Sequence, residues 1–212
     1  VSEMCIRDRN YPVQLALAPV VGALAAGNTV VLSPSEKAPA TAAALRELVP
    51  QYLDSALVSV VAGGKECNTA LLAEPWDHIL YTGGERVGRI VYEAAAKTLS
   101  PVTLELGGKS PAVVTPSRNT GAMARRIAWA KFTNAGQTCV APDYVLAVGE
   151  AALRQVTAEL PATLREFYGD DPRASKDYGR LISAEHAERL REMLQTDLDA
   201  GAELRVGGDV DV

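Results

Sequence analysis

Short apolar runs rich in β-branched residues alternate along this chain with segments of helical periodicity. Strands separated by helices pair in parallel through right-handed crossovers, because a tight turn cannot return the chain to the start of a parallel neighbour. The first half therefore predicts an α/β fold with a doubly wound parallel sheet. The predicted strands span residues 28–33, 56–64, 78–84 and 101–108, and the predicted helices span residues 13–26, 39–53, 65–74 and 85–99.

The second half repeats the alternation with longer helices and a polar loop at residues 168–179. We therefore expect two domains, at residues 10–106 and 107–212. The second domain's predicted strands span 110–115, 144–148 and 202–208, and its helices span 119–133, 150–168 and 183–200. Because the chain stops just after a new strand and a glycine turn, we interpret residues 107–212 as the truncated first part of a second α/β domain.

Composition excludes several classes of protein. Hydrophobic residues make up 48% of the chain and charged residues 22%, which is enough apolar material for a sizeable core. The net charge is −5 and there is no basic tract, so we expect neither nucleic acid nor an anionic membrane as a partner. The longest apolar run, about 12 residues from Leu15, is shorter than the roughly 20 residues that span a bilayer.

The cysteines and histidines argue against a metal site. Only three cysteines and two histidines occur, and none of the cysteines forms a CxxC pair. Free thiols of this kind fit a reducing compartment, so we expect a cytoplasmic protein without a bound metal.

The first nine residues, VSEMCIRDR, differ in character from the rest of the chain. They do not begin with methionine, and they resemble translated sequencing-adaptor peptides. We interpret residues 1–9 as a non-native leader and place the start of the first domain at Asn10.

Two turns after predicted strands could bind a nucleotide. Gly83 and Gly84 end one strand just before a helix, and Gly88 follows in a G-G-x-x-x-G spacing. Free N–H groups at a helix N-terminus favour phosphate, although many such turns need glycine for geometry alone. Glu36, in LSPSE, could accept hydrogen bonds from a ribose; the alternative is that Ser35 or Glu36 caps the next helix.

The stretch TNAGQTCVAP places Cys139 behind small and polar residues, just after a predicted helix. A structural cysteine usually has apolar neighbours, so a thiol at a turn is a candidate nucleophile. Glu105, in LELGGKSP, ends a strand and is a candidate general base. Asn10, before a Tyr-Pro turn, could supply an amide to an oxyanion. Each residue alone also has an ordinary structural explanation: a buried thiol, a surface carboxylate or a turn former.

Taken together, these motifs resemble the aldehyde dehydrogenase superfamily. TLELGGKSP is similar to its general-base motif, NAGQTC to its nucleophile motif, and NYPVQLALAPVVGALAAGNTVVLSPSE to the segment with the oxyanion asparagine and ribose-binding glutamate. DHILYTGGERVGRIVYEAAAKTLSPVTLELGGKSP and YGDDPRASKDYGRLIS resemble the class 3 branch, whose members use NAD or NADP and often oxidise fatty or aromatic aldehydes. The resemblance extends over residues 10–212.

The resemblance implies roles for particular residues. Cys139 would attack the aldehyde, Asn10 and the Cys139 N–H would hold the oxyanion, and Glu105 would activate water. The first domain would be a Rossmann-like cofactor domain. Its NAD or NADP contacts would fall at Ser33, Glu36, Gly83, Gly84, Gly88 and Leu106. The partner would be a small-molecule aldehyde, and the complete protein would be a homodimer.

The chain departs from the family pattern at several points. Ser33 stands where the family usually has a lysine that contacts the adenosine ribose, which leaves the choice between NAD and NADP open. Asp8 and Arg9 replace the family's Pro-Trp before the asparagine. The family's first hundred or so residues and the rest of its catalytic domain are not represented, so we expect this chain to be an inactive fragment.

Three alternatives remain on the sequence alone. A semialdehyde or CoA-acylating dehydrogenase would share the same motifs. A non-catalytic binding protein on the same fold would be expected to lack Cys139 or Glu105, and both are present. A thiol hydrolase without nicotinamide would not need Gly83 or Glu36.

Overall fold

The computed structural model describes residues 2–6 and 10–209 of the chain. These residues form two compact units, one up to Gly107 and the other from Gly108 onwards.

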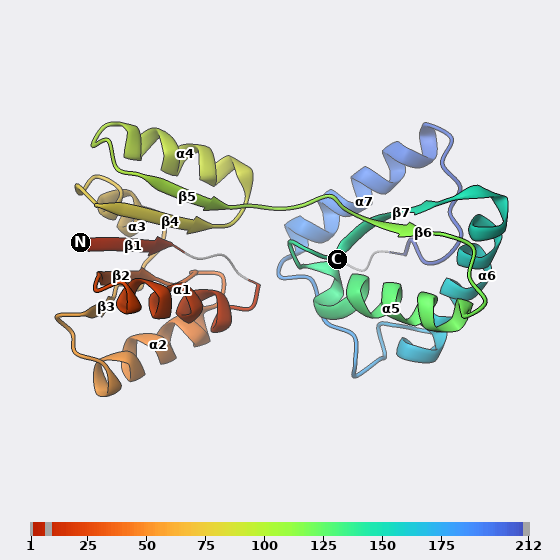
Figure 1. Ribbon diagram of the computed structural model, residues 1–212, viewed down its shortest axis with the longest axis horizontal. Helices are drawn as coiled ribbons and strands as arrows, with labels where there is room; N and C mark the ends of the chain where they lie inside the picture. The colour runs from red at the N-terminus through yellow and green to blue at the C-terminus, as the bar shows by residue number, and fades with distance from the viewer. Residues whose placement is uncertain (1, 7–9, 210–212) are drawn as a thin grey trace. The chain divides into compact units, whose positions relative to one another are not determined.

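The first unit is built on a five-stranded sheet in which every strand pairs in parallel, in the order β3-β2-β1-β4-β5 (Figure 1). The strands are β1 (Ser2–Ile6), β2 (Thr29–Ser33), β3 (Val58–Val60), β4 (His78–Thr82) and β5 (Val102–Glu105). The helices are α1 (Gln14–Ala25), α2 (Pro39–Tyr52), α3 (Lys65–Leu71) and α4 (Glu85–Ala96). The predicted doubly wound α/β fold is confirmed, with strand and helix bounds within a few residues of those expected.

Alternating residues of β1 pack on opposite faces of the sheet. Cys5 packs with buried residues of α1 and α2, among them Val20 and Leu45. Met4 packs on the other face with residues that include Ile79 and, on α4, Val91. Both faces are therefore covered by helices, as a parallel sheet requires, and the strand order reverses between β1 and β4.

The N-terminal segment differs from what we expected. Ser2–Ile6 is the middle strand of the sheet, hydrogen-bonded to both β2 and β4, and Met4 and Cys5 are fully buried. The folded part of this unit therefore starts before Asn10, because the sheet needs a strand at this place to join its two halves. The rest of the expected leader, residues 1 and 7–9 with Asp8 and Arg9, lies outside the described residues. That the leader is non-native stays a prediction.

The second unit contains a two-stranded parallel sheet, β6 (Ser110–Val114) with β7 (Pro142–Ala147). Its helices are α5 (Thr120–Phe132), α6 (Gly149–Tyr168) and α7 (Ala184–Asp199), and a short 3₁₀ helix, η1 (Thr133–Gly136), follows α5. The Asn119 side chain caps α5 by accepting a hydrogen bond from the Ala122 N–H at 3.2 Å. Val114, Ala152 and Val156 form the centre of a small core between the sheet and α6.

The strand predicted at residues 202–208 is not formed. These residues follow α7, have no regular secondary structure and are exposed. A strand exists only where a partner satisfies its backbone hydrogen bonds, and the described residues provide none here. The local β-propensity of this segment was therefore an insufficient basis for the prediction.

None of the helices in the described ranges combines the length and apolar character needed to cross a membrane.

The core of the first unit gives a direct test of its packing. Ile79 is fully buried beside the partly buried Trp76, whereas Ile90, on α4, is about half exposed. In a Trp129→Phe background, where Trp76 is the only tryptophan, urea unfolding can be followed by its fluorescence. We expect Ile79→Ala to lower the free energy of unfolding by about 2–5 kcal/mol. Ile90→Ala should change it by less than about 0.5 kcal/mol, and equal losses would contradict the assigned core.

Candidate functional site

The carboxyl ends of the first unit's strands gather most of the predicted site residues. Ile6 of β1 pairs in register with Ser33 and with Tyr81, and Thr82 pairs with Glu105. These four strands therefore end together at one edge of the sheet. The segments that follow them carry Asn10, Glu36, Gly83, Gly84 and Leu106. Ligands of doubly wound sheets bind beyond this edge, where the strand order reverses.

Close packing restricts the size of the residue at two of the three glycine positions after β4. A Cβ atom on Gly83 would lie 2.1 Å from the Tyr81 hydroxyl oxygen, so a larger residue there would have to displace the Tyr81 ring. A Cβ atom on Gly88 would lie 3.0 Å from the Leu106 side chain. Gly84 has open space around it, and its carbonyl accepts a hydrogen bond from the Tyr81 hydroxyl at 3.3 Å. A larger residue at Gly83 or Gly88 would therefore have to displace the Tyr81 or the Leu106 side chain, whereas Gly84 faces open space.

The first turn of α4 offers N–H groups to a ligand. The first helical hydrogen bond runs from the Gly88 N–H to the Gly84 carbonyl at 3.0 Å, so the N–H groups of residues 85–87 have no acceptor among the described residues. Glu85 brings a negative charge to this turn, and Arg89 pairs with it at 2.5 Å. Free N–H groups, an open glycine and a compensated carboxylate fit the phosphates of a dinucleotide.

Ser33 and Glu36 occupy different environments. Ser33 is 1% exposed, and its hydroxyl donates to the Asn68 side-chain oxygen at 2.7 Å, so it is turned into the unit. Ser35 accepts a hydrogen bond from the Lys37 N–H at 3.2 Å, which makes a local turn and not a cap on α2. Glu36 is exposed, and its carboxylate has no hydrogen-bond partner in the described part of the chain. Of these residues, Glu36 is the one available to a ribose.

Asn10 and Glu105 flank the same edge of the sheet. Glu105 ends β5 and is exposed within its unit, while its backbone carbonyl accepts the Gly83 N–H at 2.9 Å. Asn10 is half-buried and precedes Tyr11, which has a left-handed φ of 46°. The glycine turn and the backbone of Glu105 are thus joined by one hydrogen bond.

Cys139 follows an unusual turn in the second unit. Asn134, Ala135 and Gly136 all have left-handed φ angles, of 55°, 53° and 77°. For a residue with a Cβ this conformation costs about 1 kcal/mol or more. Glycine and asparagine tolerate it best, which is a physical reason for Asn134 and Gly136 in this turn, while Ala135 bears the strain.

Gln137 ties this turn to a distant segment. Its amide nitrogen donates to the Asn134 carbonyl at 3.0 Å and to the Arg180 carbonyl at 3.1 Å. Its amide oxygen accepts the Ile182 N–H at 3.0 Å. Sequence reasoning missed Gln137, and the only available signal was a glutamine beside the candidate nucleophile.

The backbone of Cys139 is closely packed on one side and open on the other. A Cβ atom on Gly108 would lie 2.4 Å from the Cys139 carbonyl oxygen, so Gly108 is required for this approach. The Cys139 N–H has no acceptor among residues 2–6 and 10–209, and the thiol is exposed and reduced. An exposed thiol beside an unpaired N–H is the pair that nucleophilic attack on a carbonyl requires. The sequence did not single out Gly108.

Asp143 joins three segments around the turn that precedes Cys139. Its carboxylate pairs with Lys109, before β6, and lies 3.6 Å from the Lys131 ammonium near the end of α5. The hydrogen bond from Lys109 holds the pKa of Asp143 below its usual range, the charge of Lys131 acts in the same direction, and burial opposes both. Lys131 also lies close to Gly136, so the ion pair between Asp143 and Lys131 is adjacent to the turn.

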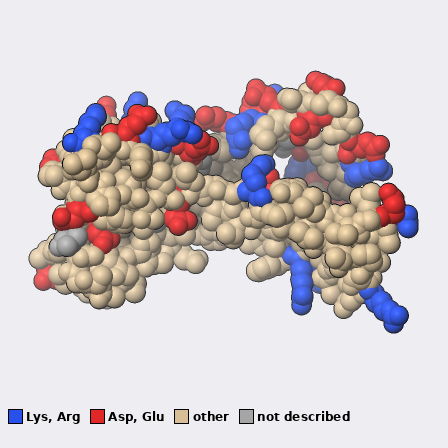
Figure 2. Space-filling model, turned by 45° about the horizontal axis from the view of Figure 1, so that its top comes forward, with Lys and Arg blue, Asp and Glu red and all other residues tan. Residues whose placement is uncertain are grey.

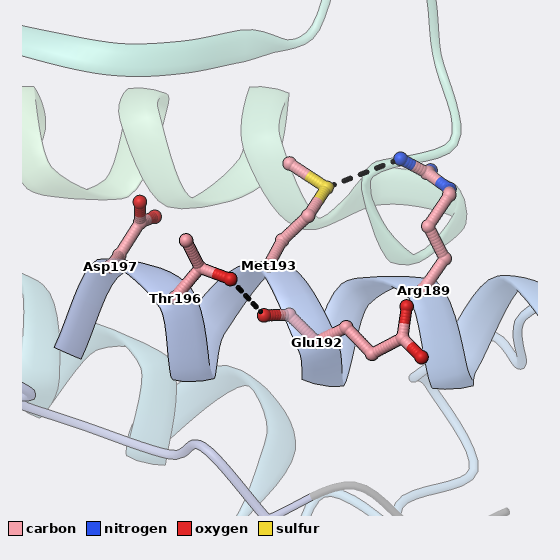
Figure 3. A pocket seen from close by; sticks show the side chains of 5 residues that line it. All are labelled: Arg189, Glu192, Met193, Thr196 and Asp197. Atoms are coloured by element: carbon pink, nitrogen blue, oxygen red, sulfur yellow. Dashed lines mark hydrogen bonds between the residues drawn. The ribbon is translucent and has the colours of Figure 1, made fainter. Parts of the chain in front are cut away.

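No predicted site residue lines the hollow found on α7. The hollow is open, has a volume of about 300 Å³ and lies along one helix face (Figure 3). The Arg189 guanidinium donates to the Met193 sulfur at 3.2 Å, and the Thr196 hydroxyl donates to the Glu192 carbonyl at 2.8 Å. On the face in view in Figure 2, basic and acidic side chains are interspersed. The described residues contain no group of three or more side chains suited to a metal ion.

The first unit has the architecture of a dinucleotide-binding domain, and the second presents an exposed thiol on a constrained turn. Residues 4–212 match the sequence profile of the aldehyde dehydrogenase family. The chain belongs to this family.

Named relatives agree with this assignment. The chain is 48% identical over 203 residues to aldehyde dehydrogenase family 3 member A2 of Mus musculus, a match that covers 95% of this chain and 40% of the relative. It is 50% identical over 185 residues to the dimeric NADP-preferring aldehyde dehydrogenase of Rattus norvegicus, covering 87% of this chain and 41% of that one. The predicted class 3 resemblance is confirmed, and the chain spans about two fifths of the length of these relatives.

A solved structure agrees as well. The chain matches an aldehyde dehydrogenase of Mycobacterium tuberculosis complexed with NAD⁺, with a TM-score of 0.89 and 33% identity, over 99% of this chain and 44% of that one. These matches do not favour the hydrolase or the non-catalytic binding protein.

The contact of Gly108 with Cys139 predicts a large effect from one methyl group. Gly108→Ala should displace the Cys139 carbonyl and slow alkylation of the thiol by iodoacetamide by about tenfold or more, since small misplacements at reacting groups cost up to about a hundredfold. Gly107→Ala is the matched control, because a Cβ there meets nothing within 4 Å. Equal rates for the two variants, measured by mass spectrometry of the Cys139 peptide, would refute the contact.

The Asp143 interactions predict a pH-dependent stability. A lowered native pKa stabilises the fold above the ordinary carboxyl value of about 3.9, and this stabilisation is lost as the pH falls through the native pKa. Asp143→Asn should therefore lower the free energy of unfolding at pH 7, by less than about 1 kcal/mol because the pair is partly solvated. The difference from the parent should vanish below the native pKa in urea titrations. A difference that persists unchanged there would contradict the assignment.

Proposed function

We propose that the enzyme containing this chain oxidises fatty or aromatic aldehydes to carboxylic acids with NAD or NADP. The observation that carries the proposal is Cys139, an exposed thiol with an unpaired N–H on a constrained turn, in a chain of the aldehyde dehydrogenase family. Because the relatives are about two and a half times as long, we also propose that the chain is one piece of a longer enzyme.

The first step falls to Cys139. Its thiolate attacks the aldehyde carbonyl carbon, and the carbonyl oxygen becomes an oxyanion as the thiohemiacetal forms. The Cys139 N–H and the Asn10 side-chain amide donate hydrogen bonds to this oxyanion. Each such donor contributes a factor of about 10²–10³ to the rate in comparable sites.

The second step needs an acceptor for the hydride that leaves the same carbon. Bound NAD or NADP supplies that chemistry, and the aldehyde carbon is left as a thioester on Cys139. The residues proposed to hold the cofactor are Gly84, with the N–H groups of the first turn of α4, and Glu36 for a ribose. Gly83, Gly88 and Leu106 shape the turn by packing. The fit of an open helix N-terminus to phosphate supports this part of the proposal.

The last step falls to Glu105. Its carboxylate accepts a proton from water, the water oxygen attacks the thioester, and the acid leaves as the thiolate of Cys139 is restored. The exposure of Glu105 at the end of β5 leaves it open to water.

The environment of Ser33 bears on the choice between NAD and NADP. Ser33 is buried and bonded to Asn68, so we propose that this position makes no direct contact with the adenosine ribose. NAD and NADP must therefore be compared by measurement.

The name of the rat relative supports a homodimer for the complete enzyme. We also propose a cytoplasmic location, because free thiols fit a reducing compartment.

The test uses the complete enzyme and follows formation of reduced nicotinamide by absorbance. Benzaldehyde and a medium-chain aldehyde are each assayed with NAD and with NADP. Cys139→Ala should reduce turnover by at least about a thousandfold, because it removes the nucleophile. Glu105→Gln should instead give one burst of reduced cofactor per site and then stop, because hydride transfer precedes water attack.

Cys67→Ala is the control for these variants, since Cys67 is a half-buried free cysteine on α3 and has no role in the proposed reaction. Full activity in Cys139→Ala, or no reduction of either cofactor by the folded parent, would sink the proposal. A burst in Cys139→Ala would show that another group is the nucleophile.

A further inference from the structure

The Gln137 side chain bonds both to the turn that precedes Cys139 and to a segment more than forty residues away. We propose that Gln137 is a positioning residue that fixes the orientation of the Cys139 N–H and thiol by tying this turn to residues 180–182. The inference rests on the proposed function for its kinetic consequence. Its structural part concerns the geometry of Cys139 alone.

The amide of Gln137 is engaged on both sides. Two donor bonds run to the carbonyls of Asn134 and Arg180, at 3.0 and 3.1 Å, and one acceptor bond comes from the Ile182 N–H at 3.0 Å. The Asn134 side-chain amide in turn donates a hydrogen bond to the Gln137 backbone carbonyl at 3.1 Å. A carboxylate of the same length has no donor for the two carbonyls, and an asparagine is one methylene too short to span them.

The segment that receives these bonds is itself anchored. The Tyr178 ring lies 4.9 Å from the Tyr168 ring and 6.4 Å from the Phe132 ring, at the ends of α6 and α5. Gly179 packs on the backbone of Asn134 and Ala135. Gln137 therefore links the turn to a fixed support and not to a free loop.

The turn needs such a link because its backbone is strained. Asn134 and Ala135 are left-handed residues with side chains, and the Thr138 N–H to Gly136 carbonyl bond of 2.9 Å closes the turn directly before Cys139. Without the amide of Gln137, the strain favours relaxation to ordinary backbone angles. Such a relaxation would rotate the peptide that carries the Cys139 N–H.

The proposal predicts a particular pattern of kinetics. Gln137 is half-buried and bonded to backbone, so its loss should act on the step that needs correct thiol geometry and leave aldehyde binding nearly unchanged. In Gln137→Ala, we expect kcat to fall about tenfold to a hundredfold with KM within about twofold, since misplaced reacting groups lose rate in this range. Alkylation of Cys139 by iodoacetamide should slow in parallel.

Gln137→Glu adds a signature that a general loss of stability would not produce. Its carboxylate would face the carbonyls of Asn134 and Arg180, and protonation would return one donor while keeping an acceptor for Ile182. The ratio of its alkylation rate to that of the parent should therefore rise as the pH falls. This pH-dependent ratio of alkylation rates also tests the proposal if Gln137→Ala fails to fold.

Gln155→Ala is the matched control. Gln155, on α6, also ties down a loop with its amide, through bonds to the Ser117 carbonyl at 2.9 Å and the Ser117 N–H at 3.2 Å. It should lose comparable loop contacts yet keep the parent's kcat and Cys139 alkylation rate.

The experiment uses the complete enzyme with both readouts. Unchanged kcat and alkylation in Gln137→Ala, equal losses in Gln155→Ala, or a flat pH ratio in Gln137→Glu would each overturn the proposal. If the parent reduces neither NAD nor NADP, the proposed function fails, and the alkylation rates still decide whether Gln137 positions Cys139.

Discussion

The pairing of β1 with both β2 and β4 is the constraint on which the first unit depends. With β1 in the middle, the chain builds one half of the sheet through α1 and α2 and the other half through α3 and α4. The reversal leaves the ends of β1 and β4 side by side with no crossover helix between them. The segments with Asn10 and Gly84 therefore share an edge because of the topology, although more than seventy residues separate them.

In the second unit, the feature that matters for the proposed function is the turn that precedes Cys139. The proposed role of Cys139 needs an N–H that is free to bind an oxyanion, whereas the interior of a helix or a paired strand engages its N–H groups in backbone hydrogen bonds. The left-handed run at Asn134–Gly136 leaves the Cys139 N–H unpaired at a cost in strain. Hydrogen bonds from Gln137 and the close approach of Gly108 keep that costly conformation in place.

The sequence predicted those features of the structure that depend on residues close together in the chain. Helix and strand periodicity, and the motif around Cys139, led to the correct fold class and family. The strand Ser2–Ile6 was missed because its composition was taken as foreign, although Met4, Cys5 and Ile6 suffice for a buried strand. The strand at residues 202–208 failed because pairing is not a local property. The contacts of Gln137 with residues 43 and 45 positions away, and of Gly108 with Cys139, could not be read from spacing.

One backbone hydrogen bond in the first unit couples two parts of the proposed chemistry. The Gly83 N–H bonds to the carbonyl of Glu105, and the neighbouring pair Thr82 and Glu105 is in register. The turn proposed for phosphate is therefore linked through the main chain to the residue proposed for water activation. A shift of that turn would act directly on the backbone of Glu105, so the proposed cofactor site and the proposed base are coupled through the main chain and not through a loop.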